Sequence, residues 1–419
     1  MTAKQSDRSS TREASCAFDP DLSGMWKSHF KANGPNKMHV EPLIPSSLRI
    51  LEIGAHAEIK RAFPDQTRLF WTYYKSRAPV PSQELFSLEL AWRLWRDLRA
   101  GKIDLIVAWC SPYSPWNFRE LKGVLRAPLR PLTNLVRIIG VQWLRLVPGA
   151  IPIVAIDNED SRVIARHNLF LLDRAKCFFK RELPVDRWQV FQRTGHAGLP
   201  GPRFRREGKN RTLIRKLHPI SLGVSGTEDS LLISEFPQKV TDIFVGVSAD
   251  GLSTVRDQGI AQLRALAKQG IIVDFAEHRL EYRAYMQRMS HAWLSWSPEG
   301  LGWDCFRHYE APLAWSVPIM NSPTIARYMP LLDGVHGFYY QPDDKRSLAQ
   351  VIKSALADKV RLEAMATEAR RHVLAFHLKP RPFADLIVGT ALARSHGGAY
   401  PGLTSAVNLT TSHEQCHRP

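Results

Sequence analysis

The stretch that decides the fold is Ser297-Pro-Glu-Gly-Leu-Gly-Trp-Asp-Cys-Phe-Arg-His-Tyr-Glu310-Ala-Pro-Leu-Ala-Trp-Ser-Val-Pro-Ile-Met320. Its order of residues predicts a strand, a glycine-bearing turn, a helix and a second strand. Gly300 and Gly302 let the backbone of the turn approach a ligand closely, because neither carries a side chain. The stretch therefore predicts a parallel α/β unit with a binding site at its turn.

Three side chains behind this turn are candidate nucleotide-binding residues. Asp304 is expected to cap the helix, whose first N–H groups and positive dipole end suit a diphosphate. Arg307 lies about one turn further on and offers the fork-shaped cation that phosphate prefers. Glu310 can accept two hydrogen bonds from a ribose diol. A second interpretation pairs Glu310 with Arg307 on a solvated helix face and leaves His308 beside them as a packed or exposed histidine.

Alternating apolar runs and helical patterns surround this stretch and predict a doubly wound α/β domain over residues 240–377. The expected strands are 243–248, 271–275, 292–297, 317–320 and 337–340, and the expected helices are 254–269, 280–290, 304–315, 324–332 and 347–376.

A similar series precedes it and predicts a first domain over residues 48–225. Together the two series predict an α/β fold of two doubly wound, Rossmann-like domains facing a cleft. The aperiodic ends, 1–47 and 395–419, are expected to be disordered tails, and the basic, Gly- and Pro-containing stretch 199–216 an exposed loop. The expected strands of the first domain are 48–54, 103–109, 151–157 and 176–179, with a helix over 85–100.

Charged residues at the strand ends of the first domain are candidates for chemistry in the cleft. Asp157 and Asp160 follow an apolar strand, where a general base can reach an acceptor hydroxyl. His56 follows the first strand, in a loop that also faces the cleft. Lys180 and Arg181 are candidate phosphate contacts across the cleft. The alternatives are a turn-and-cap cluster for the acids, a structural histidine, and a basic pair at the surface.

Composition and charge limit the class of protein. The chain has 419 residues, enough for two or three domains at about 150 residues each. Lys and Arg number 57 against 40 Asp and Glu, a net charge of +17 that favours an anionic partner. The five cysteines are an odd number and form no Cys-x-x-Cys pair, so we expect a reducing compartment and neither a disulfide framework nor a zinc site.

Two further segments bear on partners and location. The N-terminal segment lacks the apolar core of a secretory signal, and no apolar run reaches the ~20 residues of a spanning helix, so we expect a cytoplasmic protein. The segment Phe118–Leu146 carries six basic residues against one acid among apolar neighbours, which is typical of binding to an anionic membrane surface. The alternative is a solvated basic helix face. Residues 203–216 contain a single aromatic, Phe204, and no nucleic-acid partner is expected.

The motifs Glu299-Gly-Leu-Gly302, Glu310-Ala and Val317-Pro-Ile together resemble the carboxyl-terminal domain of GT-B glycosyltransferases of the group-1-like superfamily. The Arg307-x-x-Glu310 spacing is most similar to the branch of spore-maturation and exostosin-type transferases. Weaker similarity continues in residues 156–160, 178–183 and 219–224, so the resemblance covers roughly residues 48–377. One departure is clear: ten residues separate Glu299 from Glu310, whereas common retaining members place two glutamates seven apart. The resemblance therefore leaves retaining or inverting stereochemistry open.

This resemblance implies transfer of a sugar from a nucleotide diphosphate sugar to a hydroxyl of a glycan or lipid-linked acceptor. It implies a ribose contact for Glu310 and stabilisation of the leaving diphosphate by Arg307. From the basic segment Phe118–Leu146 we expect the protein to be peripheral on the inner face of the membrane. No metal is expected, since no Asp-x-Asp motif stands in the cleft-facing segments. Two alternatives stay open: a nucleotide-sugar epimerase on the same fold, and a non-catalytic relative that binds glycan or lipid.

Overall fold

The computed structural model describes most of the central part of the chain. Most of the two expected tails, and residues 118–140 of the predicted membrane segment, lie outside the described residues. No helix in the described part is long and apolar enough to cross a membrane. The described residues are 44–72, 84–85, 88–111, 141–147, 149–192, 207–225, 233–247, 253–276, 278–342 and 347–395.

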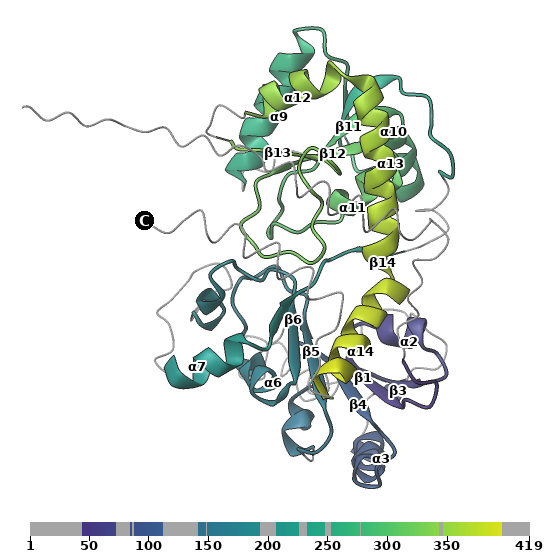
Figure 1. Ribbon diagram of the computed structural model, residues 1–419, viewed down its shortest axis with the longest axis vertical. Coiled ribbons are helices and arrows are strands. Elements are labelled where there is room, and N and C mark those ends of the chain that lie inside the picture. The colour runs from purple at the N-terminus through teal and green to yellow at the C-terminus, as the bar shows by residue number, and fades with distance from the viewer. Residues whose placement is uncertain are drawn as a thin grey trace, which may run out of the picture. The chain divides into compact units, whose positions relative to one another are not determined.

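The first sheet is a parallel sheet in the order β3-β2-β1-β4-β5-β6-β7 (Figure 1). The strand order reverses between β1 and β4, as in Rossmann-like folds. Its central strands are fully buried apolar runs, which is what helices on both faces of a parallel sheet require. The strands are β1 Ile50–Gly54, β2 Thr67–Trp71, β3 Glu84–Leu85, β4 Leu105–Trp109, β5 Ile153–Asp157, β6 Cys177–Lys180 and β7 Leu217–Pro219.

Short helices accompany this sheet, and α3 shows why they form. Leu90, Leu94 and Leu98 recur at four-residue spacing and join the core, while Trp92 of the same helix stays exposed. The expectation of a loop over 199–216 is wrong for its second half, because residues 207–214 form α7. The helices are α2 Glu58–Ala62, α3 Leu88–Arg99, α6 Leu169–Arg174 and α7 Glu207–Ile214, with 3-10 turns at Trp143–Leu146, Arg166–Asn168 and Arg187–Phe191.

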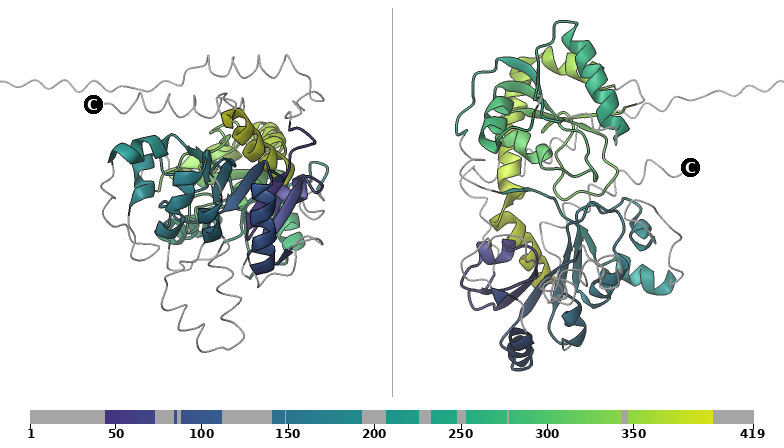
Figure 2. Two further views of the ribbon diagram at one scale, coloured as in Figure 1. Left: turned by 90° about the horizontal axis from the view of Figure 1, so that it is seen from below. Right: turned by 180° about the vertical axis from the view of Figure 1, so that it is seen from behind.

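The second sheet is also parallel, in the order β10-β9-β11-β12-β13. Helices α9 and α12 lie on one face, and α10 and α11 lie on the other, where the carboxyl-terminal part of α13 joins them (Figure 2). The strands are β9 Thr241–Val245, β10 Val273–Phe275, β11 Ala292–Trp296, β12 Val317–Asn321 and β13 Phe338–Tyr340, and the helices are α9 Thr254–Ala267, α10 Tyr282–Ser290, α11 Arg307–Leu313, α12 Leu348–Leu356 and α13 Lys359–Phe376. The two sheets confirm the predicted α/β fold with two Rossmann-like domains.

The chain passes between the two sheets twice, at β8 Val224–Ser225 and β14 Leu378–Lys379, which pair with each other. After β14, helix α14 (Arg381–Ser395) returns to the first sheet and contacts α2 and β6 (Figure 1). This return helix was not foreseen from the sequence. The ring of Phe383 stacks on Trp109 at 5.7 Å, so α14 covers part of the first sheet.

The expected helix over 324–332 is wrong. The segment runs as an irregular loop that pairs with the first half of the chain: Ala326 N–H donates to Leu183 O at 2.7 Å, and Ile325 bridges to Pro184. Its prolines disfavour a helix at both ends, since each removes an N–H donor and restricts the residue before it. The segment therefore serves as a contact between the two halves.

Candidate nucleotide-sugar site

A pocket of about 940 Å³ opens at the carboxyl ends of the second sheet's strands. Ligands of open α/β sheets bind at this edge. Asp160 and Arg181, which follow β5 and β6 of the first sheet, also line it, so both halves of the chain contribute. The other lining residues are Leu222, Gly246, Val247, Arg256, Ala276, His278, Arg279, Leu280, Glu281, Tyr282, Tyr285, Gly300, Leu301, Gly302, Asp304, Cys305, Phe306, Arg307 and Glu310.

The glycine turn at the pocket is held by Glu182 of the first half. Gly300 N–H donates to Gly302 O at 2.8 Å, which closes the turn. The carboxylate of Glu182 accepts from the backbone N–H groups of Trp303 and Asp304, at 3.0 and 2.9 Å. A Cβ on Gly302 would lie 2.5 Å from Oε1 of Glu182, so only glycine fits this close approach.

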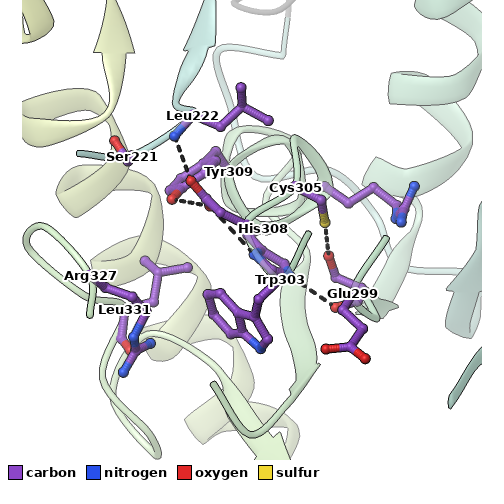
Figure 3. Close-up of polar contacts among 12 residues, drawn as sticks. Ser221, Leu222, Glu299, Trp303, Cys305, His308, Tyr309, Arg327 and Leu331 are labelled. Atoms are coloured by element: carbon purple, nitrogen blue, oxygen red, sulfur yellow. Dashed lines mark hydrogen bonds and ion pairs between the residues drawn. The ribbon is translucent and has the colours of Figure 1, made fainter. Parts of the chain in front are cut away.

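Asp304 lines the pocket but does not cap a helix, so that part of the prediction is wrong. Helix α11 begins at Arg307, after Cys305 and Phe306 have completed the turn. Asp304 Oδ2 instead accepts from Leu222 N–H at 2.6 Å, and Oδ1 accepts from Tyr309 Oη–H at 2.6 Å (Figure 3). Burial opposes ionisation of this carboxyl group. The charge of His308, whose Nδ1 is 3.9 Å from Oδ1, and the hydrogen bonds from Tyr309 and Leu222 outweigh burial and lower the Asp304 pKa.

Glu310 and Arg307 both line the pocket from α11. The Tyr285 hydroxyl donates to Glu310 Oε2 at 3.2 Å, and burial raises the Glu310 pKa. Arg307 Nη2 donates to Pro298 O at 3.3 Å, and its buried Nε has no hydrogen-bond partner. Within the described part of the chain, then, each group contacts a neutral neighbour, and the two do not form the ion pair that one interpretation of the sequence favoured.

Further guanidinium groups make the pocket basic. Arg256 Nε donates to Glu299 O at 3.0 Å beside the glycine turn. Arg181 is buried and ion-paired with Asp160, and Arg279 is exposed at the rim. Together with Arg307, these residues place four guanidiniums around one pocket. Such a lining suits a ligand with several negative oxygens.

Asp157 and Lys180, two of the predicted site residues, are placed in the core and do not line the pocket. They lie opposite each other on β5 and β6, and Lys180 Nζ donates to Asp157 Oδ2 at 2.9 Å. Their side chains are 3% and 0% exposed. Parallel register brings the two charges together, so each neutralises the other and neither reaches a ligand.

His56 is also placed away from the pocket. Its ring lies 4.3 Å from the ring of Trp109, which also stacks on Phe383 of α14. Burial, together with the charges of Lys379 and Arg61, lowers the His56 pKa to about 4. The side chain is therefore a neutral packing residue. A general base that works near neutral pH needs a higher pKa.

Several pocket residues were not found from the sequence, among them Tyr285, Arg256 and Cys305. Glu182, which holds the glycine turn, was also missed. For Tyr285 we see no signal, because it stands in an ordinary amphipathic helix. Glu182 does carry a sequence signal. It belongs to the stretch 178–183, which resembles the transferase family, and it directly follows the candidate phosphate contacts Lys180 and Arg181. Among the described residues, no group of three or more His, Cys, Asp or Glu side chains is placed to hold a metal ion.

No family model and no curated protein sequence matches the chain. Solved structures do match. HepE from Anabaena in complex with UDP is 14% identical, with 84% of this chain and 100% of that chain covered and a TM-score of 0.41. Sucrose-phosphate synthase from Thermosynechococcus elongatus is 12% identical, with 83% and 99% covered and a TM-score of 0.43. A glycosyltransferase from Rickettsia africae is 12% identical, with 81% and 96% covered and a TM-score of 0.42. Because these TM-scores are below 0.5, the site is assigned from its own residues.

Proposed function

We propose that the chain is a glycosyltransferase that moves a sugar from a nucleotide diphosphate sugar to an acceptor hydroxyl. The observation that carries the proposal is the pocket that four arginines line together with a buried carboxylate, Glu310, behind a glycine turn. A nucleotide diphosphate sugar needs both features. Its diphosphate requires cations, and its ribose offers two hydroxyl donors that a carboxylate can accept.

Glu310 is the proposed ribose ligand. The Tyr285 hydroxyl fixes one carboxylate oxygen from the side of α10, which leaves the group oriented before a ligand arrives. Gly246, directly after β9, packs against the Tyr285 ring. A Cβ there would lie 2.7 Å from that ring, so glycine permits the close approach. A preoriented carboxylate loses little conformational freedom when the ribose binds.

Arg307 is the proposed partner of the leaving diphosphate. Negative charge on the diphosphate grows as the bond to the sugar breaks, and a fixed guanidinium stabilises that charge without reorganising. Its buried Nε has no protein partner, so an incoming phosphate oxygen would supply one. We propose Arg181 as a second phosphate contact from the opposite wall of the pocket. In this mechanism the guanidiniums do the work that a metal ion does elsewhere.

Asp160 is the proposed general base. It is the aspartate of the first half that lines the pocket, and its side chain is 52% exposed. An acceptor hydroxyl entering from the first domain would lose its proton to this carboxylate as the sugar transfers. Asp157 and His56, both outside the pocket, have no part in this proposal.

We extend the proposal to a lipid-linked acceptor at an anionic membrane. The supporting feature is α3, where Trp92 is 60% exposed and stacks on Trp95 at 5.1 Å. Arg93 and Arg96 are exposed on the same helix. An aromatic side chain among arginines suits the interface of an anionic bilayer.

Sedimentation with vesicles tests this extension. We expect binding to vesicles that contain phosphatidylserine and much weaker binding to vesicles of phosphatidylcholine alone. The double variant Arg93→Gln/Arg96→Gln should bind the anionic vesicles roughly 30-fold more weakly, since each basic residue contributes about 1 kcal/mol near such a surface. Equal binding to both vesicle types at low salt would remove the membrane from the proposal.

Calorimetric titration with UDP, GDP, ADP and dTDP tests the donor site. We expect one of these nucleotides to bind, and Glu310→Gln to weaken it about tenfold, because hydrogen bonds to a charged group contribute about 1.5–3 kcal/mol. Glu363→Gln is the matched control, since Glu363 is an exposed glutamate of α13 outside the pocket. An unchanged affinity in Glu310→Gln would refute the ribose assignment.

Product analysis with the corresponding nucleotide sugars separates the remaining alternatives. Conversion of the sugar nucleotide that requires an acceptor supports the transferase. Conversion without an acceptor would instead indicate an epimerase. Tight binding with no turnover against glycan or lipid-linked acceptors would indicate a non-catalytic relative.

A further inference from the structure

Cys305 differs from the other described cysteines in its position. It stands in the turn before α11, is partly exposed, and lines the pocket. Its Sγ lies 3.7 Å from Pro298 O, to which the thiol can donate, and 3.8 Å from Ser297 Oγ. Cys110 and Cys177 are buried in the first half and do not line the pocket. A molecule that enters the pocket therefore meets the Cys305 thiol and neither of these two.

A buried histidine accompanies this thiol. His308 lies three residues further on, its side chain is 1% exposed, and its Nε2 is 3.2 Å from Ser297 O (Figure 3). Burial opposes a charge on His308, but Cys305 and Asp304 outweigh it and raise the His308 pKa to about 9, so both ring nitrogens carry a proton at neutral pH. Nδ1 is 3.9 Å from Asp304 Oδ1 and has no hydrogen-bond partner in the described part of the chain. Thiol, imidazole and carboxylate thus form one cluster with an unoccupied ring nitrogen.

The electrostatics of the cluster favour a thiolate. Burial opposes ionisation of Cys305, but the charges of His308 and Arg307 and the hydrogen bond with Ser297 outweigh it, and the pKa falls to about 7. Burial raises the Cys177 pKa to about 11 and the Cys110 pKa well above its ordinary value. Reactivity follows the thiolate, so Cys305 is the one of the three that is nucleophilic at neutral pH. The ionisable groups around it are His308, Arg307, Asp304, Tyr309 and Tyr285.

We propose that Cys305 is a modification site, at which small hydroperoxides oxidise the thiol and a low-molecular-weight thiol then caps it as a mixed disulfide. In the first step the thiolate sulfur attacks one peroxide oxygen. An S–O bond forms, the O–O bond breaks, and the departing hydroxide or alkoxide takes the proton held by His308 to leave as water or an alcohol. The sulfur loses two electrons to the peroxide and becomes a sulfenic acid.

In the second step an incoming thiol attacks the sulfur of the sulfenic acid. An S–S bond forms and water leaves, with no further oxidant needed. The added group occupies the pocket beside Glu310 and Arg307, so this modification would compete with a nucleotide. That regulatory consequence rests on the proposed function, whereas the reactivity of Cys305 does not.

Peptide mapping of the full-length protein tests the reactivity directly. The folded protein is treated with hydrogen peroxide, sulfenic acid is trapped with dimedone, and each cysteine is quantified by mass spectrometry. We expect Cys305 to react at least ~10-fold faster than Cys110 and Cys177 at pH 7, and the preference to vanish in guanidinium chloride. Equal reaction of the three cysteines in the folded protein would overturn the proposal.

The pH profile separates a poised thiol from a merely accessible one. We expect the Cys305 rate to level off between pH 7 and 8, instead of rising toward the ~8.5 of a free thiol. His308→Gln retains a donor for Ser297 O but removes the imidazole, and it should move the profile upward. The wild-type pH profile tests the cluster even if the variant does not fold. A midpoint near that of a free thiol would contradict the proposal that the cluster lowers the pKa of Cys305.

Nucleotide protection then tests the regulatory part. A nucleotide that binds in calorimetry should slow Cys305 oxidation, and the mixed disulfide should abolish its binding. If the modified protein binds nucleotide as well as the unmodified protein, the regulatory part is wrong although the site reacts. If Cys305 reacts selectively and none of the four nucleotides binds or protects, the proposed function fails and the modification site stands.

Discussion

The two sheets end in similar pairs of acidic and basic residues, yet Asp157 and Lys180 of the first sheet are closed off in the core, whereas Arg307 and Glu310 of the second line the pocket. At the first sheet, Asp157 and Lys180 come from adjacent strands in register and bond to each other inside the core. At the second, Arg307 and Glu310 come from one helix, and each contacts a neutral neighbour at the pocket. A charge therefore serves a ligand only where no opposite charge lies in register on the neighbouring strand.

The largest expected effect comes from removing one partner of the buried Asp157–Lys180 pair. We expect Asp157→Ala to destabilise the protein by about 3–5 kcal/mol, because it leaves the Lys180 ammonium buried without a counter-charge. Chemical denaturation followed by circular dichroism measures the change in the free energy of unfolding.

The control for this experiment removes both charges. Asp157→Leu/Lys180→Met should recover most of the lost stability, since an apolar pair of similar size avoids the cost of burying charge. If Asp157→Ala is as stable as the wild type, the two side chains are solvated and the distinction between the two edges fails.

Arg307→Lys tests the charged residues at the second sheet. The substitution keeps the charge but loses the fork that can contact two phosphate oxygens at once. We expect stability and donor affinity to change little and turnover to fall by ~10²-fold, equivalent to about 2.7 kcal/mol at the transition state. Steady-state kinetics at saturating donor measure it.

Arg361→Lys is the matched control, because Arg361 is an exposed arginine of α13 outside the pocket. Its turnover should equal that of the wild type. Near-wild-type turnover in Arg307→Lys as well would remove Arg307 from the mechanism and leave it as a structural residue of the turn.

The alternation of apolar runs and helical patterns was sufficient to predict the second sheet and four strands of the first, but it missed β2, β3 and β7. It places β1, β4, β5 and β6 and each strand of the second sheet within a few residues of their observed positions. Short-range periodicity depends on burial, and the strands of parallel sheets are buried on both faces. The glycine turn with Arg307 and Glu310 was found for the same reason, because strand, turn and helix are contiguous in the chain.

The features that the sequence did not predict correctly depend on contacts between residues that are distant in the chain. The pairing of Asp157 with Lys180 requires the strand order, which no local pattern contains. The irregular loop at 324–332 was taken for a helix because its apolar residues fit one. Its backbone instead hydrogen-bonds to residues 183–184 of the first half. Asp304 likewise does not cap α11. It accepts a hydrogen bond from Leu222 N–H, which is distant in the sequence.

Asp160 and Arg181 form a second ion pair at the first sheet's edge, and it provides the smallest and most discriminating test. Unlike Asp157, Asp160 is half exposed at the pocket, and the buried Arg181 keeps a second carboxylate, Glu182, 3.9 Å from its Nε when Asp160 is removed. We therefore expect Asp160→Asn to change the free energy of unfolding by less than ~1 kcal/mol, as exposed pairs do. The same variant separates its two candidate roles by turnover. A general base contributes 10²–10⁴-fold, so a loss of that size at unchanged donor affinity assigns the base to Asp160. Turnover equal to the wild type would leave Asp160 only as the ion-pair partner of Arg181, and both strand ends of the first sheet would then be structural.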